Sequence, residues 1–247
     1  MTQSMSLGNS IRPLRNVAAL TTLIKRVEGR EFGLPGMAVF YGPTGFGKTY
    51  AACHASAVQK AIHIPVQRLW TQKTLLTAIL RELSIVPRKT LAEMMMQANE
   101  ALAAAQRPLI IDETDYAIER GMIEIIRDFH DGSHVPVILI GMEMLPQKLR
   151  KWELVDGRIL SWVAAEPADL RDARLLADIY ALGVKIDDAL LKRILQTNKG
   201  SVRRISTDLA HVLEQSKLQG VREMTLDAWG DAPFLRGDAP GPREGLL

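Results

Sequence analysis

The residues with the clearest chemistry form one short run with a recognisable spacing. Positions 42–49 fit the phosphate-binding pattern G-x-x-x-x-G-K-[ST]. Glycines in such a run let backbone N–H groups turn toward phosphate oxygens, and a helix that starts there favours negative charge. We expect Lys48 to reach the outer phosphates of a nucleotide and the Thr49 hydroxyl to bind Mg²⁺. The residues expected to contact the nucleotide are Gly42, Pro43, Thr44, Gly45, Phe46, Gly47, Lys48, Thr49 and Tyr50.

The flanking segments distinguish a phosphate-binding loop from a glycine-rich turn with a surface lysine. An apolar, strand-like run at 37–41 precedes the loop, and a helix-favouring run at 50–55 follows it. Composition, spacing and flanks therefore all favour a strand–loop–helix unit.

A later apolar run, 109–111, ends in the adjacent carboxylates Asp112 and Glu113. We expect Asp112 to bind Mg²⁺ and Glu113 to polarise the attacking water, so that the loop and this strand end together form an ATP site. The alternative is a strand that ends in a charged turn. Two interpretations of Asp115 stay open. It belongs with Asp112 and Glu113 to the carboxylates of the ATP site, or it caps the helix that follows. The D-E-x-D spacing also occurs in helicases, but residues 168–247 are too few for the second lobe that a helicase needs.

Composition narrows the class of protein. The chain has 247 residues, of which 47% are hydrophobic and 24% charged, as in ordinary globular proteins. Aromatic residues make up only 5%, which argues against a stacking platform for single-stranded nucleic acid. Cys53 is the only cysteine, so we expect no intrachain disulfide and no cysteine zinc site, and we expect Cys53 to be a small buried core residue.

Targeting and charge signals are weak. No apolar run approaches the roughly 20 residues of a membrane span, and no signal peptide is visible, so we expect a cytoplasmic protein with no membrane partner. The net charge of +3 permits a nucleic-acid partner without requiring one. The basic excess within residues 1–30 has two open interpretations, a solvated helix face or a contact to DNA or a neighbouring subunit.

The pattern of apolar segments predicts an α/β fold. Expected strands cover 37–41, 61–66, 107–112, 135–140 and 158–164. Helices are expected between them, at 17–27, 50–60, 71–83, 90–105, 116–129 and 145–152, and then at 169–182, 187–196 and 201–218. Continuous apolar strands that alternate with helices indicate a parallel five-stranded sheet covered on both faces, followed by a purely helical part.

The same pattern divides the chain into four parts. We expect an N-terminal arm and helix at 1–30, with disorder over Met1–Ser10, and a P-loop α/β core at 31–167. A helical lid is expected at 168–228, and a flexible tail rich in glycine and proline at 229–247.

Over roughly residues 10–220 this arrangement resembles the AAA+ ATPases. In that family a G-x-x-R element of the lid carries an arginine that approaches the nucleotide, and Gly200-Ser201-Val202-Arg203 matches it. The resemblance therefore implies a catalytic role for Arg203, with the adjacent Arg204 able to exchange with it. The alternative is that both are solvated arginines on a helix.

The family also places an arginine finger near the fifth strand, where it reaches the γ-phosphate of the neighbouring subunit. Arg158 is the best match and Arg150 the second. The resemblance thus implies a homo-oligomer, either a ring or a helical filament. The fourth strand of the family normally ends in a polar sensor residue, but here the segment 139–143 reads Leu-Ile-Gly-Met-Glu. Either Glu143 substitutes for that residue or hydrolysis is slow.

Within the AAA+ proteins, the chain resembles the transposition protein B group of Mu-like phages. The resembling stretches are 69–76, 107–113, 125–131 and 137–143. The likeness implies an ATP- and Mg²⁺-dependent filament on double-stranded DNA that selects target sites and stimulates a transposase in a bacterial cell. That group carries an additional N-terminal DNA-binding domain, whereas this sequence starts almost directly at the ATPase, so we expect DNA contacts from the ATPase body.

The expected DNA contacts are largely to phosphates and so depend little on base sequence. The candidate residues, each of which can also be read as a solvated surface side chain, are Arg68, Thr71, Lys73 and Lys89. Two other functions stay open: a AAA+ helper for replication such as a helicase loader, and a weakly hydrolysing nucleotide switch that binds protein partners.

Overall fold

The computed structural model describes residues 13–235, so the expected disordered arm at 1–10 and the tail beyond residue 235 lie outside the described residues. The chain divides into two compact units. One consists of Arg15–Glu166, and the other contains the described residues from Pro167 onward. The first helix, α1 (Arg15–Glu28), lies in the first unit, against β1 and α2, rather than in a separate N-terminal part.

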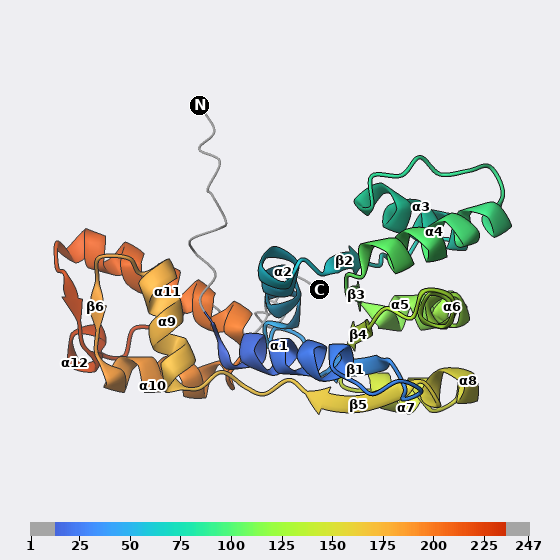
Figure 1. Ribbon diagram of the computed structural model, residues 1–247. Helices are drawn as coiled ribbons and strands as arrows, with labels where there is room; N and C mark the ends of the chain where they lie inside the picture. The colour runs from blue at the N-terminus through green and yellow to red at the C-terminus, as the bar shows by residue number, and fades with distance from the viewer. Residues whose placement is uncertain (1–12, 236–247) are drawn as a thin grey trace, which may run out of the picture. The chain divides into compact units, whose positions relative to one another are not determined.

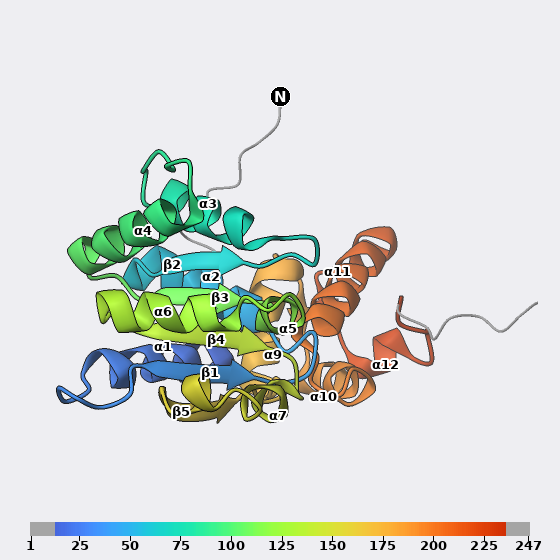
Figure 2. The same ribbon diagram turned by 90° about the vertical axis from the view of Figure 1, so that its right-hand side faces the viewer.

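The first unit is built on a five-stranded parallel sheet in the order β2-β3-β4-β1-β5 (Figure 2). The strands are β1 (Met37–Tyr41), β2 (Ile62–Pro65), β3 (Leu109–Asp112), β4 (Val137–Gly141) and β5 (Ile159–Ala164). Every residue of β3 and β4 is buried, as expected for parallel strands covered on both faces. The expected five-stranded α/β fold is therefore confirmed.

Helices cover both faces of this sheet. The helix α2 (Lys48–Gln59) packs with α1 on one face, whereas α4 (Leu91–Ala105) and α6 (Ile123–Ser133) pack together on the other (Figure 1). The remaining helices of the unit are α3 (Gln72–Glu82), α5 (Thr114–Glu119), α7 (Leu145–Leu149) and α8 (Glu153–Asp156). Because strands and helices alternate along the chain, the carboxyl ends of all five strands share one edge of the sheet.

Two expected helices are each divided in the structure. The helix predicted over 116–129 is interrupted after α5, where Gly121 takes a left-handed conformation with φ of 64° and Met122 donates its backbone N–H to Ala117. Such a glycine turn ends a helix. The helix predicted over 145–152 ends at α7, and non-helical Trp152 separates it from α8.

The prediction that Cys53 is a core residue is wrong. The apolar face of α2 consists of Ala51, Ala52 and Ala55, and Cys53 lies on the opposite, exposed side. The helical period of 3.6 residues places positions 52 and 55 on one face and position 53 off it.

The second unit is not purely helical, contrary to the prediction. Its helices are α9 (Leu170–Tyr180), α10 (Asp188–Thr197), α11 (Val202–Gln219) and α12 (Leu226–Trp229). Between them, β6 (Lys185–Ile186) and β7 (Glu223–Met224) form a short parallel pair.

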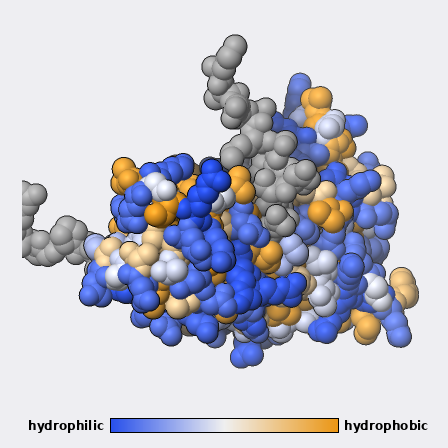
Figure 3. Space-filling model, turned by 90° about the vertical axis from the view of Figure 1, so that its left-hand side faces the viewer, coloured by the Kyte–Doolittle hydropathy of each residue, from blue (hydrophilic) through white to orange (hydrophobic). Residues whose placement is uncertain are grey.

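The face shown in Figure 3 is covered mainly by hydrophilic side chains, with hydrophobic ones in small scattered groups.

Candidate nucleotide site

The loop between β1 and α2 has the backbone shape that its glycines predict. Gly47 precedes the first residue of α2 with φ of 83°, and Gly45 has φ of 89°. A side chain at either position would strain the backbone, because L-residues rarely adopt these angles. The loop thus delivers Lys48 to the first turn of α2, with the exposed Thr49 next to it.

The Lys48 ammonium is held against the loop. Its Nζ donates to the carbonyl oxygens of Gly42 at 2.6 Å and Pro43 at 2.9 Å. Burial lowers the pKa of Lys48, and nearby carboxylates act in the opposite direction; these belong to Glu113, Asp112, Asp115 and Glu143. The lysine predicted to bind phosphate therefore lies within the electrostatic field of the carboxylates predicted to bind metal and water.

Asp112 ends β3 at the same edge of the sheet and is 3% exposed. Its Oδ1 accepts the backbone N–H of Glu113 at 2.9 Å, and its Oδ2 lies 3.3 Å from Nε2 of His63 on β2. Burial lowers the pKa of His63, but hydrogen bonds to Asp112 and Cys53 outweigh this effect and raise the pKa to about 9. His63 is therefore protonated at neutral pH, next to the carboxyl group of Asp112.

The sequence analysis did not identify His63 as a site residue. Its position in the second expected strand was visible, but this position alone does not show that it lies beside Asp112. The parallel strands β2 and β3 are direct neighbours, with Ile64 opposite Ile111. His63 on β2 therefore lies next to the strand that carries Asp112. Only the strand order, which the sequence does not give, makes these two strands neighbours.

Glu113 alone makes the turn from β3 into α5. It has φ of 55° and ψ of 41°, a left-handed conformation that costs a non-glycine residue about 1 kcal/mol or more. Such strain is often found at functional residues. Glu113 is exposed next to the buried Asp112, so its carboxylate is accessible to water.

Asp115 does not cap α5, which corrects one of the two sequence interpretations. The helix has no side-chain cap. Instead, Asp115 is fully buried and accepts the backbone N–H of Met142 at 2.7 Å and Nζ of Lys148 at 2.7 Å.

A buried asparagine in α1 holds the phosphate loop from the other side. Asn16 is 4% exposed and donates to the carbonyl oxygens of Phe46 and Glu166, both at 2.7 Å. Its Oδ1 accepts the backbone N–H of Glu166 at 2.9 Å. Asn16 thus joins the middle of the loop to the chain that follows β5. No feature of the sequence identified this residue.

Comparisons with known proteins agree with this fold. Residues 33–149 match the model of the AAA domain family. The chain is structurally similar to the ORC1 protein of Aeropyrum pernix, determined in complex with DNA, with a TM-score of 0.60 and 16% identity over 87% of this chain and 63% of that one. The chain has the AAA+ fold. It is also similar to Cdc6p of Pyrobaculum aerophilum, with a TM-score of 0.60 and 16% identity over 90% of this chain and 66% of that one.

The chain spans slightly less than two thirds of the length of each of these structures, and the likeness extends to the fold. No curated protein sequence matches it.

Within the AAA+ sheet, Arg158 and the phosphate loop lie at opposite ends. Arg158 directly precedes β5, which runs parallel to β1 with Ile159 opposite Met37, the first residue of β1. The loop follows the last residue of β1. Five residues of strand separate the two ends by roughly 17 Å. Arg158 is therefore far from the phosphate loop of its own chain.

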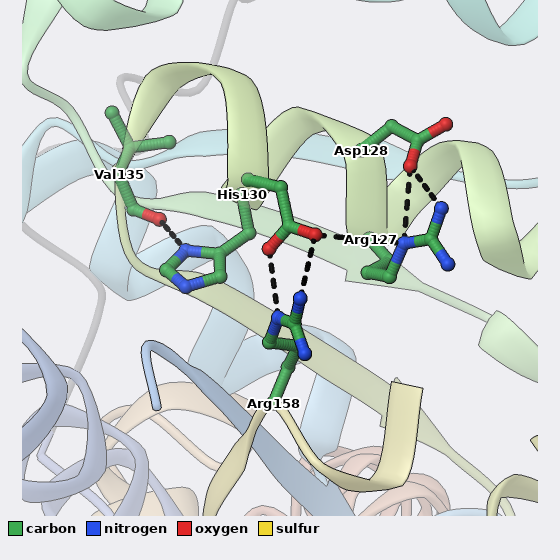
Figure 4. A network of polar contacts seen from close by, with 6 residues as sticks. Arg127, Asp128, His130, Val135 and Arg158 are labelled. Carbon is green, nitrogen blue, oxygen red and sulfur yellow. Dashed lines mark hydrogen bonds and ion pairs between the residues drawn. The ribbon is translucent and has the colours of Figure 1, made fainter. Parts of the chain in front are cut away.

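The Arg158 guanidinium is half-exposed and paired with Asp131 (Figure 4). Its Nε and Nη2 donate to the two carboxylate oxygens at 2.9 and 3.1 Å, a bidentate arrangement that fixes the plane of the guanidinium. The neighbouring Arg127 pairs with Asp128 and lies 3.7 Å from Asp131. The second finger candidate, Arg150, is exposed at the end of α7.

A cavity of about 610 Å³ opens beside Arg158 at this end of the sheet. Its lining includes the fully exposed Phe32, the half-exposed Leu34 and the imidazole of His130. Burial lowers the pKa of His130, whose Nδ1 is 2.9 Å from the Val135 carbonyl oxygen (Figure 4).

In the second unit, the G-x-x-R element begins α11, with Arg203 and Arg204 both exposed on its first turn. Gly200 has φ of 70°, and a Cβ at this position would lie 2.3 Å from the Cβ of Pro167. The glycine of the element is therefore required by local packing, whatever Arg203 does.

Three of the four DNA candidates are exposed along one short stretch of the chain. Arg68, Thr71 and Lys73 are exposed where the chain enters α3, and Thr71 caps that helix by accepting the N–H of Thr74. Lys89 is exposed beyond the other end of α3, and 11 helical residues correspond to about 16 Å.

The donor set suits Mg²⁺ bound together with a nucleotide. Among residues 13–235, no three His, Cys, Asp or Glu side chains gather to hold a metal ion by themselves. Mg²⁺ usually takes one or two protein ligands and completes its shell with phosphate and water, which Asp112 and Thr49 can accommodate. Within the same described range, no helix is long and apolar enough to cross a membrane.

Proposed function

We propose that this chain is an ATP-dependent AAA+ ATPase that assembles on double-stranded DNA, largely without base specificity, and stimulates a transposase during target selection in the cytoplasm of a bacterial cell. The observation that carries the ATPase proposal is the meeting of Lys48, Asp112 and Glu113 at one edge of the sheet. The transposase partner is supported by the sequence likeness to the Mu-like phage group.

The residues of the site have separate roles in this proposal. The loop N–H groups and Lys48 bind the phosphates of ATP, and Asp112 and Thr49 hold Mg²⁺. Mg²⁺, when bound, neutralises charge on the phosphates. Glu113 orients the attacking water. For Arg203, or Arg204 beside it, the proposed role is that of the lid arginine implied by the resemblance to the AAA+ family.

Arg158 completes the site of a neighbouring subunit. Its place at the far end of the sheet prevents it from reaching the phosphates of its own chain, while its exposure leaves it accessible to a partner. An arginine supplied in trans stabilises charge in the transition state. ATP binding therefore links subunits into a ring or filament, and hydrolysis releases them.

DNA contact is proposed for the exposed entry to α3. Arg68 and Lys73 supply positive charge there, and Thr71 lies between them in the sequence. That a protein of the same fold, the Aeropyrum pernix ORC1 protein, was determined in complex with DNA supports a nucleic-acid partner. Contacts of this kind go mainly to phosphates and weaken steeply with salt.

The test is fluorescence anisotropy of a labelled duplex with and without a non-hydrolysable ATP analogue. We expect binding that requires the analogue, falls steeply with salt and weakens in Lys73→Ala. Lys151→Ala, which removes an exposed lysine elsewhere in the unit, is the matched control. Duplex binding that ignores the analogue, or no binding at low salt, would refute the proposal. Stimulation of strand transfer by a purified Mu-type transposase tests the partner.

Two other functions predict different results in the same experiments. A helicase-loader role predicts a preference for single-stranded DNA over duplex. A regulatory switch is favoured by the apolar Met142 after β4, where AAA+ proteins normally carry a polar sensor. The switch function predicts that the chain binds ATP and that DNA does not change the rate of phosphate release. With the transposition function, DNA stimulates release, and Glu113→Gln binds ATP but stays assembled without turnover.

A further inference from the structure

Asp115 is a buried carboxylate that no role above uses. It lies two residues after Glu113, in the first turn of α5, and its side chain is 1% exposed. A carboxylate removed from water is costly unless its oxygens are satisfied. Both oxygens of Asp115 have partners, and neither partner belongs to its own helix.

The first partner ties α5 to the end of β4. Oδ2 accepts the backbone N–H of Met142 at 2.7 Å. A Cβ on Gly141 would lie 2.4 Å from the same oxygen, so the carboxylate packs directly on the strand end and only glycine fits there. The Gly141 carbonyl in turn accepts the N–H of Gly42, the first glycine of the phosphate loop, at 3.3 Å. A continuous path therefore runs from the Glu113 turn to the loop.

The second partner balances the charge. Nζ of Lys148, on α7, donates to Oδ1 at 2.7 Å, and the exposed Glu119 lies 3.8 Å from the same ammonium. The hydrogen bond to Asp115 raises the pKa of Lys148. Lys148 is therefore a cation at neutral pH, placed directly against the buried carboxyl group of Asp115.

We propose that Asp115 is a positioning residue for ATP hydrolysis: through the N–H of Met142 it holds the Glu113 turn at a fixed distance from the phosphate loop. The apolar Met142 side chain cannot form a hydrogen bond at the end of β4. Asp115, from α5, provides a hydrogen bond there by accepting the Met142 backbone N–H. This inference rests on the proposed ATPase function. Asp115 touches no reacting atom, so its effect should fall on turnover and spare nucleotide affinity.

The test compares Asp115→Ala with wild type in steady-state phosphate release, nucleotide binding and thermal unfolding. We expect kcat to fall roughly 10-fold or more, because small displacements of a water-orienting group have large effects on rate. The dissociation constant for a fluorescent ATP analogue should change less than about 3-fold, since Lys48 and the loop are intact. Glu119→Gln is the matched control and should leave kcat unchanged.

Two further variants keep the test decisive if Asp115→Ala folds poorly. Gly141→Ala pushes on Oδ2 and should lower kcat in the same way, whereas Lys148→Arg retains the ion pair and should keep most of the activity. A lower melting temperature with wild-type kcat would overturn the inference and leave Asp115 a purely structural residue. A wild-type chain that releases no phosphate under any condition overturns the proposed function instead.

Discussion

Arg158 and Lys48 lie at opposite ends of one parallel sheet, Arg158 before β5 and Lys48 after β1. If each acts on phosphate, they must act on different nucleotides. We therefore predict that Arg158→Ala and Lys48→Ala are each inactive alone, with losses on the order of 10³-fold, but that an equimolar mixture recovers activity at roughly a quarter of its sites. Phosphate release from the mixture measures this. Arg127→Ala, on the neighbouring helix, is the control and should retain activity.

A mixture as inactive as its components would contradict a role in trans. An active Arg158→Ala protein would shift the assignment to Arg150, the other exposed arginine considered for this role.

The ion pair of His63 and Asp112 predicts a pH-dependent stability in EDTA. The folded-state pKa of His63, about 9, exceeds its ordinary value of 6.5, so the folded chain binds this proton more tightly than the unfolded chain does. The stabilisation is complete below pH 6.5 and is lost as the pH rises through about 9. Urea unfolding midpoints across this range should fall with pH.

His63→Gln should flatten that dependence, and His134→Gln, which removes an exposed histidine, should leave it as it is. An unchanged pH dependence in His63→Gln would show that the pair does not form in solution.

Asn16→Ala should destabilise the first unit and loosen the phosphate loop. The change leaves the part-buried Phe46 carbonyl and Glu166 N–H without this partner, and an unpaired group costs up to about 1–3 kcal/mol, the full amount where it is buried. We expect the free energy of unfolding to fall by about 2 kcal/mol or more, and ATP to bind more weakly. Denaturant titration and analogue binding measure both.

Arg26→Ala is the control on the same helix, because its single long hydrogen bond to Ser161 is exposed. Equal losses from the two substitutions would mean that helix packing, rather than Asn16, is responsible.

Gly200→Ala should destabilise the second unit much more than Gly183→Ala. Both glycines have positive φ, so each alanine meets backbone strain of about 1 kcal/mol. Only at position 200 would the new Cβ also collide with Pro167, at 2.3 Å; nothing lies within 4 Å at position 183. Thermal unfolding of the two variants measures the difference, which should exceed the strain that they share. Similar melting temperatures would contradict the close packing of Gly200 on Pro167.

Local sequence patterns predicted the sheet and singled out the central candidate residues, because strand, loop and helix signals lie within a few positions of one another. The loop at 42–49 and the carboxylates after β3 are of this kind. Asn16 and His63 could not be found in this way, since their partners lie 150 and 49 residues away in the chain. The His63 contact depends on which strands become neighbours, and the Asn16 contacts depend on how α1 packs against the sheet.

The remaining differences also have local causes. Gly121 ends a helix that apolar spacing alone would continue, and the two-residue strands β6 and β7 are too short to leave an alternating pattern. Helix periodicity applied to α2 would have placed Cys53 on the exposed face, but its residue type suggested a core position.

The exposure of Cys53 has a practical consequence. Since it is the only thiol in the chain and lies on the helix that follows the phosphate loop, a maleimide dye will attach at a single defined point without any cysteine being added or removed. His63, which pairs with Asp112, interacts with Cys53, so we expect the emission of such a dye to change when the proposed nucleotide binds.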